Sequence, residues 1–175
     1  MKKAILFFIA PGFILTVLQF STPALVDPDG YYHIKAAEII SEQGFSAFIE
    51  FPHLTQSIWQ VYNADLSLGF HLILIQFVSL FGGLIGIKVL SILSALLVFV
   101  VFWKILRSFN VPYQFLWTAF LLLCSGTFLF RMTLPRGLIF AIISQILIFY
   151  FLSKKRYFPL FLIIFAYSWI HASAL

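Results

Sequence analysis

Long apolar stretches separated by short polar segments run along the whole chain. Five of them approach the length of about 20 residues that a helix needs to cross a bilayer. These predicted spans are residues 4–23, 84–103, 113–130, 137–152 and 158–175. A sixth apolar stretch, residues 66–81, is short and holds His71 and Gln76, so it spans the membrane, lies in the interface or re-enters. The pattern predicts an all-α, polytopic transmembrane helical bundle.

The distribution of basic residues distinguishes two topologies. If residues 66–81 cross, five basic residues fall on the side of Lys2 and Lys3 and six on the other side, which is no bias. If they do not cross, seven fall on the side of the N-terminus. Because cytoplasmic loops are enriched in Lys and Arg, we prefer the second topology. It predicts a multi-pass protein of the cell membrane with a cytoplasmic N-terminus and an outer loop over residues 24–65.

The predicted outer loop contains all six acidic residues of the chain. After Asp29, apolar residues recur at the spacing of an amphipathic helix, and Gly44 is a plausible end for it. The apolar positions are Tyr31, Ile34, Ala37 and Ile40. Farther along, the aromatic residues that suit a headgroup layer are Phe51, Trp59 and Tyr62. We expect a short helix that lies on the membrane surface, followed by an aromatic segment.

Composition agrees with a membrane protein and excludes some partners. The chain is 62% hydrophobic and only 10% charged, whereas soluble domains are about a quarter charged. Its net charge of +5 does not indicate a nucleic-acid partner, because the basic residues are scattered at the ends of apolar stretches. The single cysteine, Cys124, cannot form an internal disulfide. The lipid bilayer is the partner that the composition predicts.

The string "DPDG" follows the first span directly and has two interpretations. Asp27 is a good helix N-cap, Pro28 suits the first helical position, and Asp29 then lies where the helix dipole favours a carboxylate. The functional interpretation rests on two carboxylates at the edge of the membrane. Asp27 and Asp29 could bind a divalent cation, Mg²⁺ or Mn²⁺, or could take a proton from a substrate hydroxyl or orient an amide. They are the candidate catalytic residues.

Two arginines lie in the loop "RMTLPRG", which the preferred topology places on the same side as the aspartates. Arg131 and Arg136 are either interface anchors or phosphate-binding residues, because guanidinium matches phosphate oxygens in a bidentate fork. His33, four residues after Asp29, is a candidate accessory ligand or proton relay. His53 and His71 are isolated in the sequence and are expected to be structural. An acid pair and an arginine pair on one face suit a lipid-linked phosphosugar.

This layout resembles the GT-C superfamily of integral-membrane glycosyltransferases, which includes the catalytic subunit of oligosaccharyltransferase, the protein O-mannosyltransferases and the lipid A aminoarabinose transferases. The resemblance is carried by "DPDGYYHIKAAEIISEQG" (27–44) and, more loosely, by residues 66–109, and it extends from residue 1 to about residue 152. It implies sugar transfer from a polyprenyl-phosphate donor on the extracytoplasmic face, with Asp27 or Asp29 at the active site.

One departure concerns the metal ion. Oligosaccharyltransferases carry a second acidic motif in the next outer loop, and "RMTLPRG" has no acidic residue. The resemblance therefore fits a metal-independent branch better, in which a carboxylate acts on the acceptor and arginine on the phosphate. No cofactor is certain, and Asp27 and Asp29 stay the candidate ligands of a divalent cation.

Two other function classes remain open, a transporter with polar residues through the bilayer midplane and a non-catalytic membrane scaffold. The N-terminus, with Lys2, Lys3 and the small residues of "STPA", also resembles a secretory signal peptide, although Pro23 weakens the cleavage site. We expect residues 1–175 to form one transmembrane domain, the N-terminal part of a longer protein. The sugar, the acceptor and the lipid carrier are not specified by the sequence.

Overall fold

The computed structural model of the protein describes residues 2–44, 65 and 67–171. These residues form helices joined by short connections, with no strand in the described part of the chain. In chain order the helices are α1 (Lys2–Phe20), α2 (Asp29–Gln43), α4 (Leu68–Phe81), α5 (Gly83–Ser108), α6 (Gln114–Leu123), α7 (Gly126–Thr133), α8 (Leu138–Ser153) and α9 (Tyr157–Ile170). The all-α class predicted from the sequence is confirmed.

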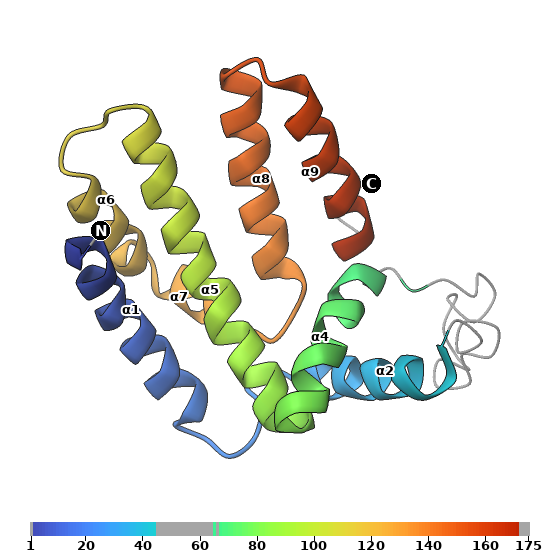
Figure 1. The fold of residues 1–175 in the computed structure, drawn as a ribbon. Helices are drawn as coiled ribbons and strands as arrows, with labels where there is room; N and C mark the ends of the chain where they lie inside the picture. The colour runs from blue at the N-terminus through green and yellow to red at the C-terminus, as the bar shows by residue number, and fades with distance from the viewer. Residues whose placement is uncertain (1, 45–64, 66, 172–175) are drawn as a thin grey trace.

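Helices α1, α5, α8 and α9 have roughly aligned axes, with alternating chain direction, and α2 lies across the lower end of this bundle (Figure 1). The N-terminus, the end of α5 and the α8–α9 turn lie toward the upper end. The links from α1 to α2, from α4 to α5 and from α7 to α8 lie toward the lower end. Segments that are far apart in the sequence therefore meet beside the start of α2.

Two clusters of buried apolar side chains hold the helices together. One joins α1, α5, α7 and α8 and includes Leu15, Phe99 and Met132. The other joins α2, α4 and α5 at the lower end and includes Ile34 and Phe70. Burying each such side chain contributes about 1.5–3 kcal/mol, so the second cluster fixes α2 against the bundle.

The predicted amphipathic helix is present as α2, and its buried face is close to the expected one. Ile34, Ala37 and Ile40 are buried. Tyr31 is 47% exposed instead, and His33 joins the buried face with an exposed fraction of 8%. The buried stripe is rotated because α2 packs under α4 as well as α5, which gives it two apolar neighbours.

The ends of α2 differ slightly from the predicted ones. The helix begins at Asp29, with Pro28 rather than Asp27 at the N-cap position, and Asp27 accepts a hydrogen bond from the Asp29 backbone N–H (3.3 Å). The predicted stop is confirmed, because α2 ends at Gly44 with a φ of 60°, which glycine adopts without steric cost. The expected aromatic segment with Phe51, Trp59 and Tyr62 lies outside the described residues.

Residues 113–130, predicted as one span, instead form two helices. α6 and α7 meet at an angle of 84°. Between them Ser125 adopts an extended backbone conformation (φ −161°, ψ 130°), which interrupts the helical hydrogen bonds, and Gly126 starts α7. The other predicted spans coincide with helices to within a few residues at most described ends.

The lengths and compositions of the helices in the structure support fewer membrane crossings than the five predicted from the sequence. Among the helices of the described chain, α5, with 26 residues, is the one that is long and apolar enough to cross a membrane. The bent pair α6–α7 is a second candidate if it counts as one span. Leu6–Phe20 of α1, and helices α4, α8 and α9, are apolar but shorter. The five-span arrangement stays a prediction.

Candidate functional site

An ion pair joins the two loops in which the sequence places the candidate site. Arg136 Nη2 donates to Asp27 Oδ1 at 2.7 Å, and Arg136 Nε donates to the other carboxylate oxygen, Oδ2. The two residues are 109 positions apart in the sequence. The Asp27 side chain is 6% exposed and that of Arg136 is 38% exposed. This fork is the bidentate arrangement in which guanidinium recognises an anion.

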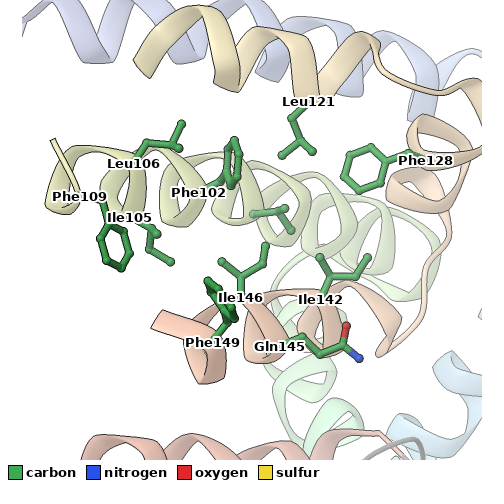
Figure 2. Close-up of a pocket in the computed structure, with 11 residues that line it drawn as sticks. Phe102, Ile105, Leu106, Phe109, Leu121, Phe128, Ile142, Gln145, Ile146 and Phe149 are labelled. Atoms are coloured by element: carbon green, nitrogen blue, oxygen red, sulfur yellow. The ribbon is translucent and has the colours of Figure 1, made fainter. Parts of the chain in front are cut away.

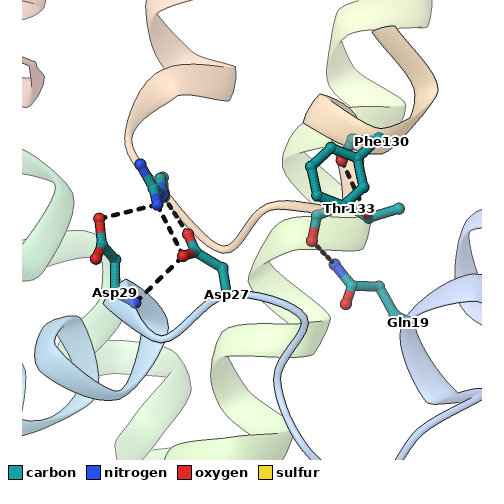
Figure 3. A network of polar contacts seen from close by, with 6 residues as sticks. Gln19, Asp27, Asp29, Phe130 and Thr133 are labelled. Carbon is teal, nitrogen blue, oxygen red and sulfur yellow. Dashed lines mark hydrogen bonds and ion pairs between the residues drawn. The ribbon is translucent and has the colours of Figure 1, made fainter. Parts of the chain in front are cut away.

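Asp29 is the second acidic partner of the same guanidinium. Its Oδ2 lies 2.9 Å from Arg136 Nη2, and its side chain is 54% exposed. Figure 3 shows Asp27 and Asp29 side by side at the start of α2, with dashed lines from both carboxylates. Within the described chain, Arg136 Nη1 makes no hydrogen bond, so two of its five N–H donors are available to an additional anion.

Both members of the ion pair are held in their charged forms. The hydrogen bonds from Arg136 lower the pKa of the Asp27 carboxyl, against the opposing effect of burial, and the Asp29 backbone N–H lowers it further. The same hydrogen bond raises the pKa of Arg136. Protonation of a carboxylate that accepts this many hydrogen bonds in its charged form would weaken those bonds. Asp27 is therefore better suited to hold Arg136 than to take up a proton.

Gly30 allows α2 to approach the loop that carries Arg136. A Cβ atom at this position would lie 2.6 Å from Leu25 Cδ1 and 2.7 Å from Pro135 Cγ. Such distances are shorter than a van der Waals contact. Because Pro135 directly precedes Arg136, a side chain at Gly30 would move α2 away from the arginine.

Two buried polar side chains fix the ends of α1 and α7 near the ion pair. Gln19 Nε2 donates to the Thr133 carbonyl at 2.6 Å, a contact that Figure 3 shows beside the aspartates. Lys88, which is 3% exposed, donates from Nζ to the Thr22 carbonyl at 2.6 Å. The first bond satisfies a carbonyl in the last turn of α7, where no partner exists within the helix, and the second satisfies a carbonyl of the α1–α2 link.

A second polar cluster, Asp65–His71–His33, joins α2 to the start of α4. His33 Nδ1 lies 2.7 Å from His71 Nε2, and His71 Nδ1 lies 2.5 Å from Asp65 Oδ2. The other Asp65 oxygen accepts the backbone N–H of Ser67 at 2.9 Å. The side chains of His71 and Asp65 are 0% and 2% exposed. Buried polar groups of this kind are costly unless they are paired.

Two members of this cluster, His71 and Asp65, are not among the site residues predicted from the sequence. His71 is expected to be isolated, whereas it contacts both His33 and Asp65. His53 lies outside the described residues. The segment "DLSLGFH" (65–71) could have predicted the contact between Asp65 and His71. An Asp just before the start of a helix lies near the residues of the first helical turn. His33 could not be paired with His71 from sequence, since 38 residues separate them.

The remaining predicted site residue, Arg131, lies in the last turn of α7 and is exposed. Within the described chain it makes no ion pair with a carboxylate. The structure thus brings Asp27, Asp29 and Arg136 together, and Arg131 does not join their ion pairs.

The carboxylates do not fit a divalent cation as they stand. Arg136 already contacts both Asp27 and Asp29, and its positive charge occupies the space that an ion would need. In the described residues, no group of three or more His, Cys, Asp or Glu side chains could hold a metal ion. Mg²⁺ and related ions need about six oxygen ligands, and two carboxylates that are already paired with an arginine do not supply them.

An apolar pocket lies elsewhere in the bundle, between α5, α8 and the α6–α7 pair. Its volume is about 540 Å³. Figure 2 shows Phe102, Leu121, Phe128 and Ile146 turned toward this space. Gln145 is its one side chain with hydrogen-bonding groups. With no charged group in its lining, the pocket is not a place for acid–base chemistry.

No protein-family model, curated protein or solved structure matches the chain. The geometry of the site therefore carries the functional argument.

Proposed function

We propose that this chain is a membrane glycosyltransferase of the GT-C type, which moves a sugar from a polyprenyl-phosphate donor to an acceptor on the extracytoplasmic face. One observation carries the proposal. Two aspartates that follow the first apolar helix meet Arg136, which lies 109 positions after Asp27, at the end of the bundle that α2 covers. A paired, partly exposed guanidinium next to an exposed second carboxylate suits a phosphate donor and a hydroxyl or amide acceptor.

In this proposal Arg136 binds the donor phosphate. Asp27 holds one edge of the guanidinium in place, and the unoccupied Nη1 faces the phosphate oxygens. Fixing the arginine in advance reduces the conformational entropy lost on binding. Arg131, five residues earlier and exposed, is the second candidate for the same phosphate. Asp29, the more exposed carboxylate, orients the acceptor.

The transfer breaks the bond between the anomeric carbon of the sugar and the phosphate oxygen. The acceptor oxygen or nitrogen forms the new bond to that carbon, and the phosphate leaves with the electron pair as polyprenyl phosphate. Arg136 stabilises the charge that develops on the leaving phosphate, an electrostatic effect that is large in a site sheltered from water. The acceptor loses one proton, which a base in the protein must accept.

The proposed placement in the membrane is multi-pass with a cytoplasmic N-terminus. Helices α1, α5, α6–α7, α8 and α9 run alternately down and up the bundle (Figure 1), which is the order that five crossings would need. α4 starts part of the way along the bundle and ends near its lower end, which supports the topology in which residues 66–81 do not cross. Short apolar helices can be accommodated by local thinning of the bilayer.

Polyprenyl-phosphate binding and sugar transfer test the proposal. The full-length protein is reconstituted in liposomes for binding of polyprenyl phosphate. Native membranes containing it are assayed with radiolabelled mannosyl and glucosyl polyprenyl phosphate. We expect Arg136→Lys to reduce affinity and turnover about 10-fold or more, because an ammonium cannot replace the bidentate fork. Arg156→Lys, at an exposed position at the opposite end of the bundle, is the matched control and should stay within twofold.

The alternatives give different results in the same assays. A transporter would move the lipid or sugar across the bilayer without breaking the glycosidic bond. If the protein is a non-catalytic scaffold, the Asp27→Asn and Arg136→Lys variants should have the same activities as wild type. Wild-type membranes that release no polyprenyl phosphate from either donor would contradict the proposed function, and so would equal binding by wild type and Arg136→Lys.

A further inference from the structure

We infer that Asp65, His71 and His33 form a proton relay that takes up the acceptor's proton during sugar transfer. The inference rests on the proposed function and names the base that it leaves open. His33 is the catalytic residue because it would contact the acceptor. His71 and Asp65 are positioning residues that act through His33.

The hydrogen bonds in this cluster can be assigned a direction. Asp65 Oδ2 is a carboxylate oxygen and can only accept, so the proton between it and His71 belongs to His71 Nδ1. In a neutral His71 the other nitrogen, Nε2, is then an acceptor. His33 Nδ1 must donate to it across the 2.7 Å contact. The remaining nitrogen, His33 Nε2, is left as an unprotonated acceptor.

His33 Nε2 is free and lies close to the ion pair. In the described part of the chain it makes no hydrogen bond, although His33 is only 8% exposed. His33 is four residues after Asp29 in α2, so the two side chains lie on the same face of the helix, with Cβ atoms about 5–6 Å apart. The charges of Arg136 and Asp27 also act on the His33 imidazole. The relay therefore ends next to the carboxylate that is proposed to orient the acceptor.

The aspartates of the ion pair are poorer candidates for the base. Both oxygens of Asp27 accept hydrogen bonds from Arg136, and these bonds lower the pKa of the carboxyl. A proton placed on Asp27 would break the contact that holds the phosphate-binding arginine. Asp29 is 54% exposed and shares the same guanidinium. His33 can accept a proton without any loss of contact to Arg136.

The protonation state of the free protein is suited to this role. Burial above all, together with the neighbouring His71 and Arg136, lowers the pKa of His33 to about 4, although the charges of Asp65 and Asp27 oppose the shift. The imidazole is therefore neutral at pH 7 and has its lone pair available. Tyr32, whose pKa is raised by burial, packs its ring near both histidines. Binding of an anionic phosphate to Arg136 would offset the positive charge and make His33 a stronger base.

The proton that the acceptor releases enters the relay at His33. The acceptor gives its proton to His33 Nε2 while its oxygen or nitrogen bonds to the anomeric carbon. His33 then passes its Nδ1 proton to His71 Nε2, and the resulting His71 imidazolium keeps its Nδ1 proton, which it donates in the hydrogen bond to Asp65 Oδ2. The electron pair of the broken glycosidic bond leaves with the phosphate. Asp65 carries the compensating negative charge at the buried end, which stabilises the imidazolium.

Turnover and its pH dependence test the relay in membranes that contain the full-length protein. We expect His33→Gln to lower kcat about 100-fold, the usual contribution of a general base, with KM for the mannosyl or glucosyl donor within twofold. The loss of wild-type kcat at acidic pH, as His33 becomes protonated, should vanish in this variant. His71→Gln and Asp65→Asn should lower kcat about 10-fold and shift the acidic limb. Tyr32→Phe, which keeps the ring packing, is the matched control and should stay within twofold.

A spectroscopic measurement tests the relay without turnover. In protein labelled with ¹⁵N-histidine at pH 7, His71 and His33 should each carry their proton on Nδ1, and the downfield His71 N–H resonance should disappear in Asp65→Asn. A proton on His33 Nε2 at pH 7 would overturn the inference. An unchanged kcat in His33→Gln would also overturn the inference. If Arg136→Lys abolished transfer in the same assay, the proposed function would remain intact. Wild type that binds no polyprenyl phosphate would contradict the proposed function, and the relay that rests on it would fall as well.

Discussion

Arg136 shows how much one side chain can organise at this site. It donates to both oxygens of Asp27 and lies within 2.9 Å of Asp29, so a single guanidinium connects the α1–α2 link to the α7–α8 link. A lysine could not do this, because its ammonium lacks the planar fork. Since Arg136 is 38% exposed, it keeps access to water and to a ligand while its partner is buried.

The ion pair predicts an acid-dependent stability. The hydrogen bonds from Arg136 lower the pKa of Asp27 in the folded state. Such a group stabilises the fold above its ordinary pKa of about 4, and this contribution is lost as the pH falls through the lower, folded value. We expect Asp27→Asn to reduce the unfolding free energy by roughly 1 kcal/mol at pH 7, a modest value because Arg136 is partly solvated. The variant should also lose less stability on acidification.

Thermal unfolding in detergent micelles between pH 7 and pH 3 measures both effects. Glu38→Gln is the control, because Glu38 forms only an exposed pair with Lys35 at 3.4 Å, and such pairs contribute little. Parallel stability curves for wild type and Asp27→Asn would show that the carboxylate has no depressed pKa.

At the scale of elements, the α4–α5 hairpin depends on two glycines. Gly82 ends α4 with a φ of 80° and donates its N–H to the Val78 carbonyl at 2.8 Å. Gly86, in the first turn of α5, lies directly against the backbone of α4. A Cβ atom there would be 2.5 Å from the Phe77 carbonyl oxygen. This close contact holds α4, and with it His71 and Asp65, beside α2.

The hairpin predicts opposite effects for two glycine substitutions. Gly86→Ala should destabilise the protein by about 1–3 kcal/mol, because its methyl group meets backbone that cannot move aside. That penalty exceeds the gain of up to about 1 kcal/mol from better helix propensity. Gly126→Ala, at the start of α7 with nothing within 4 Å of the added Cβ, should be neutral or slightly stabilising. Unfolding in detergent compares the two, and equal midpoints would disprove the close helix contact.

At the scale of the whole molecule, the bundle collects its chemistry at one end. The ion pair and the Asp65–His71–His33 cluster both contact α2, which lies across the lower end in Figure 1. The basic residues Lys154, Lys155 and Arg156 lie at the α8–α9 turn, toward the other end. Basic residues in cytoplasmic loops orient membrane proteins. If the α8–α9 turn is cytoplasmic, the ion pair and the Asp65–His71–His33 cluster at the other end face outward.

Cysteine labelling tests this orientation. In a Cys124→Ser background, which removes the exposed native thiol, we introduce Ser21→Cys after α1 and Arg156→Cys before α9. Both native positions are exposed. A membrane-impermeant maleimide added to intact cells should label Ser21→Cys, and should label Arg156→Cys only after permeabilisation. Labelling of both from the outside, or the reverse pattern, would contradict a site on the extracytoplasmic face.

The sequence by itself determined the helical class, most helix positions and the character of α2. These follow from local information, because apolar stretches, helical spacing and a glycine stop act within a few residues of each other. It also singled out Asp27, Asp29 and Arg136 as candidate residues, since charges at the ends of apolar stretches are few. It did not reveal the bend between α6 and α7, which depends on the backbone conformation of Ser125.

Only the tertiary structure decided which of these charges meet. Asp27 pairs with Arg136 and not with Arg131, although the two arginines are only five residues apart, because Gly30 lets α2 pack against Pro135. His71 joins His33 because the α4–α5 hairpin folds α4 over α2. Contacts between residues 38 or 109 positions apart depend on how whole helices pack, and no local pattern in the sequence encodes them.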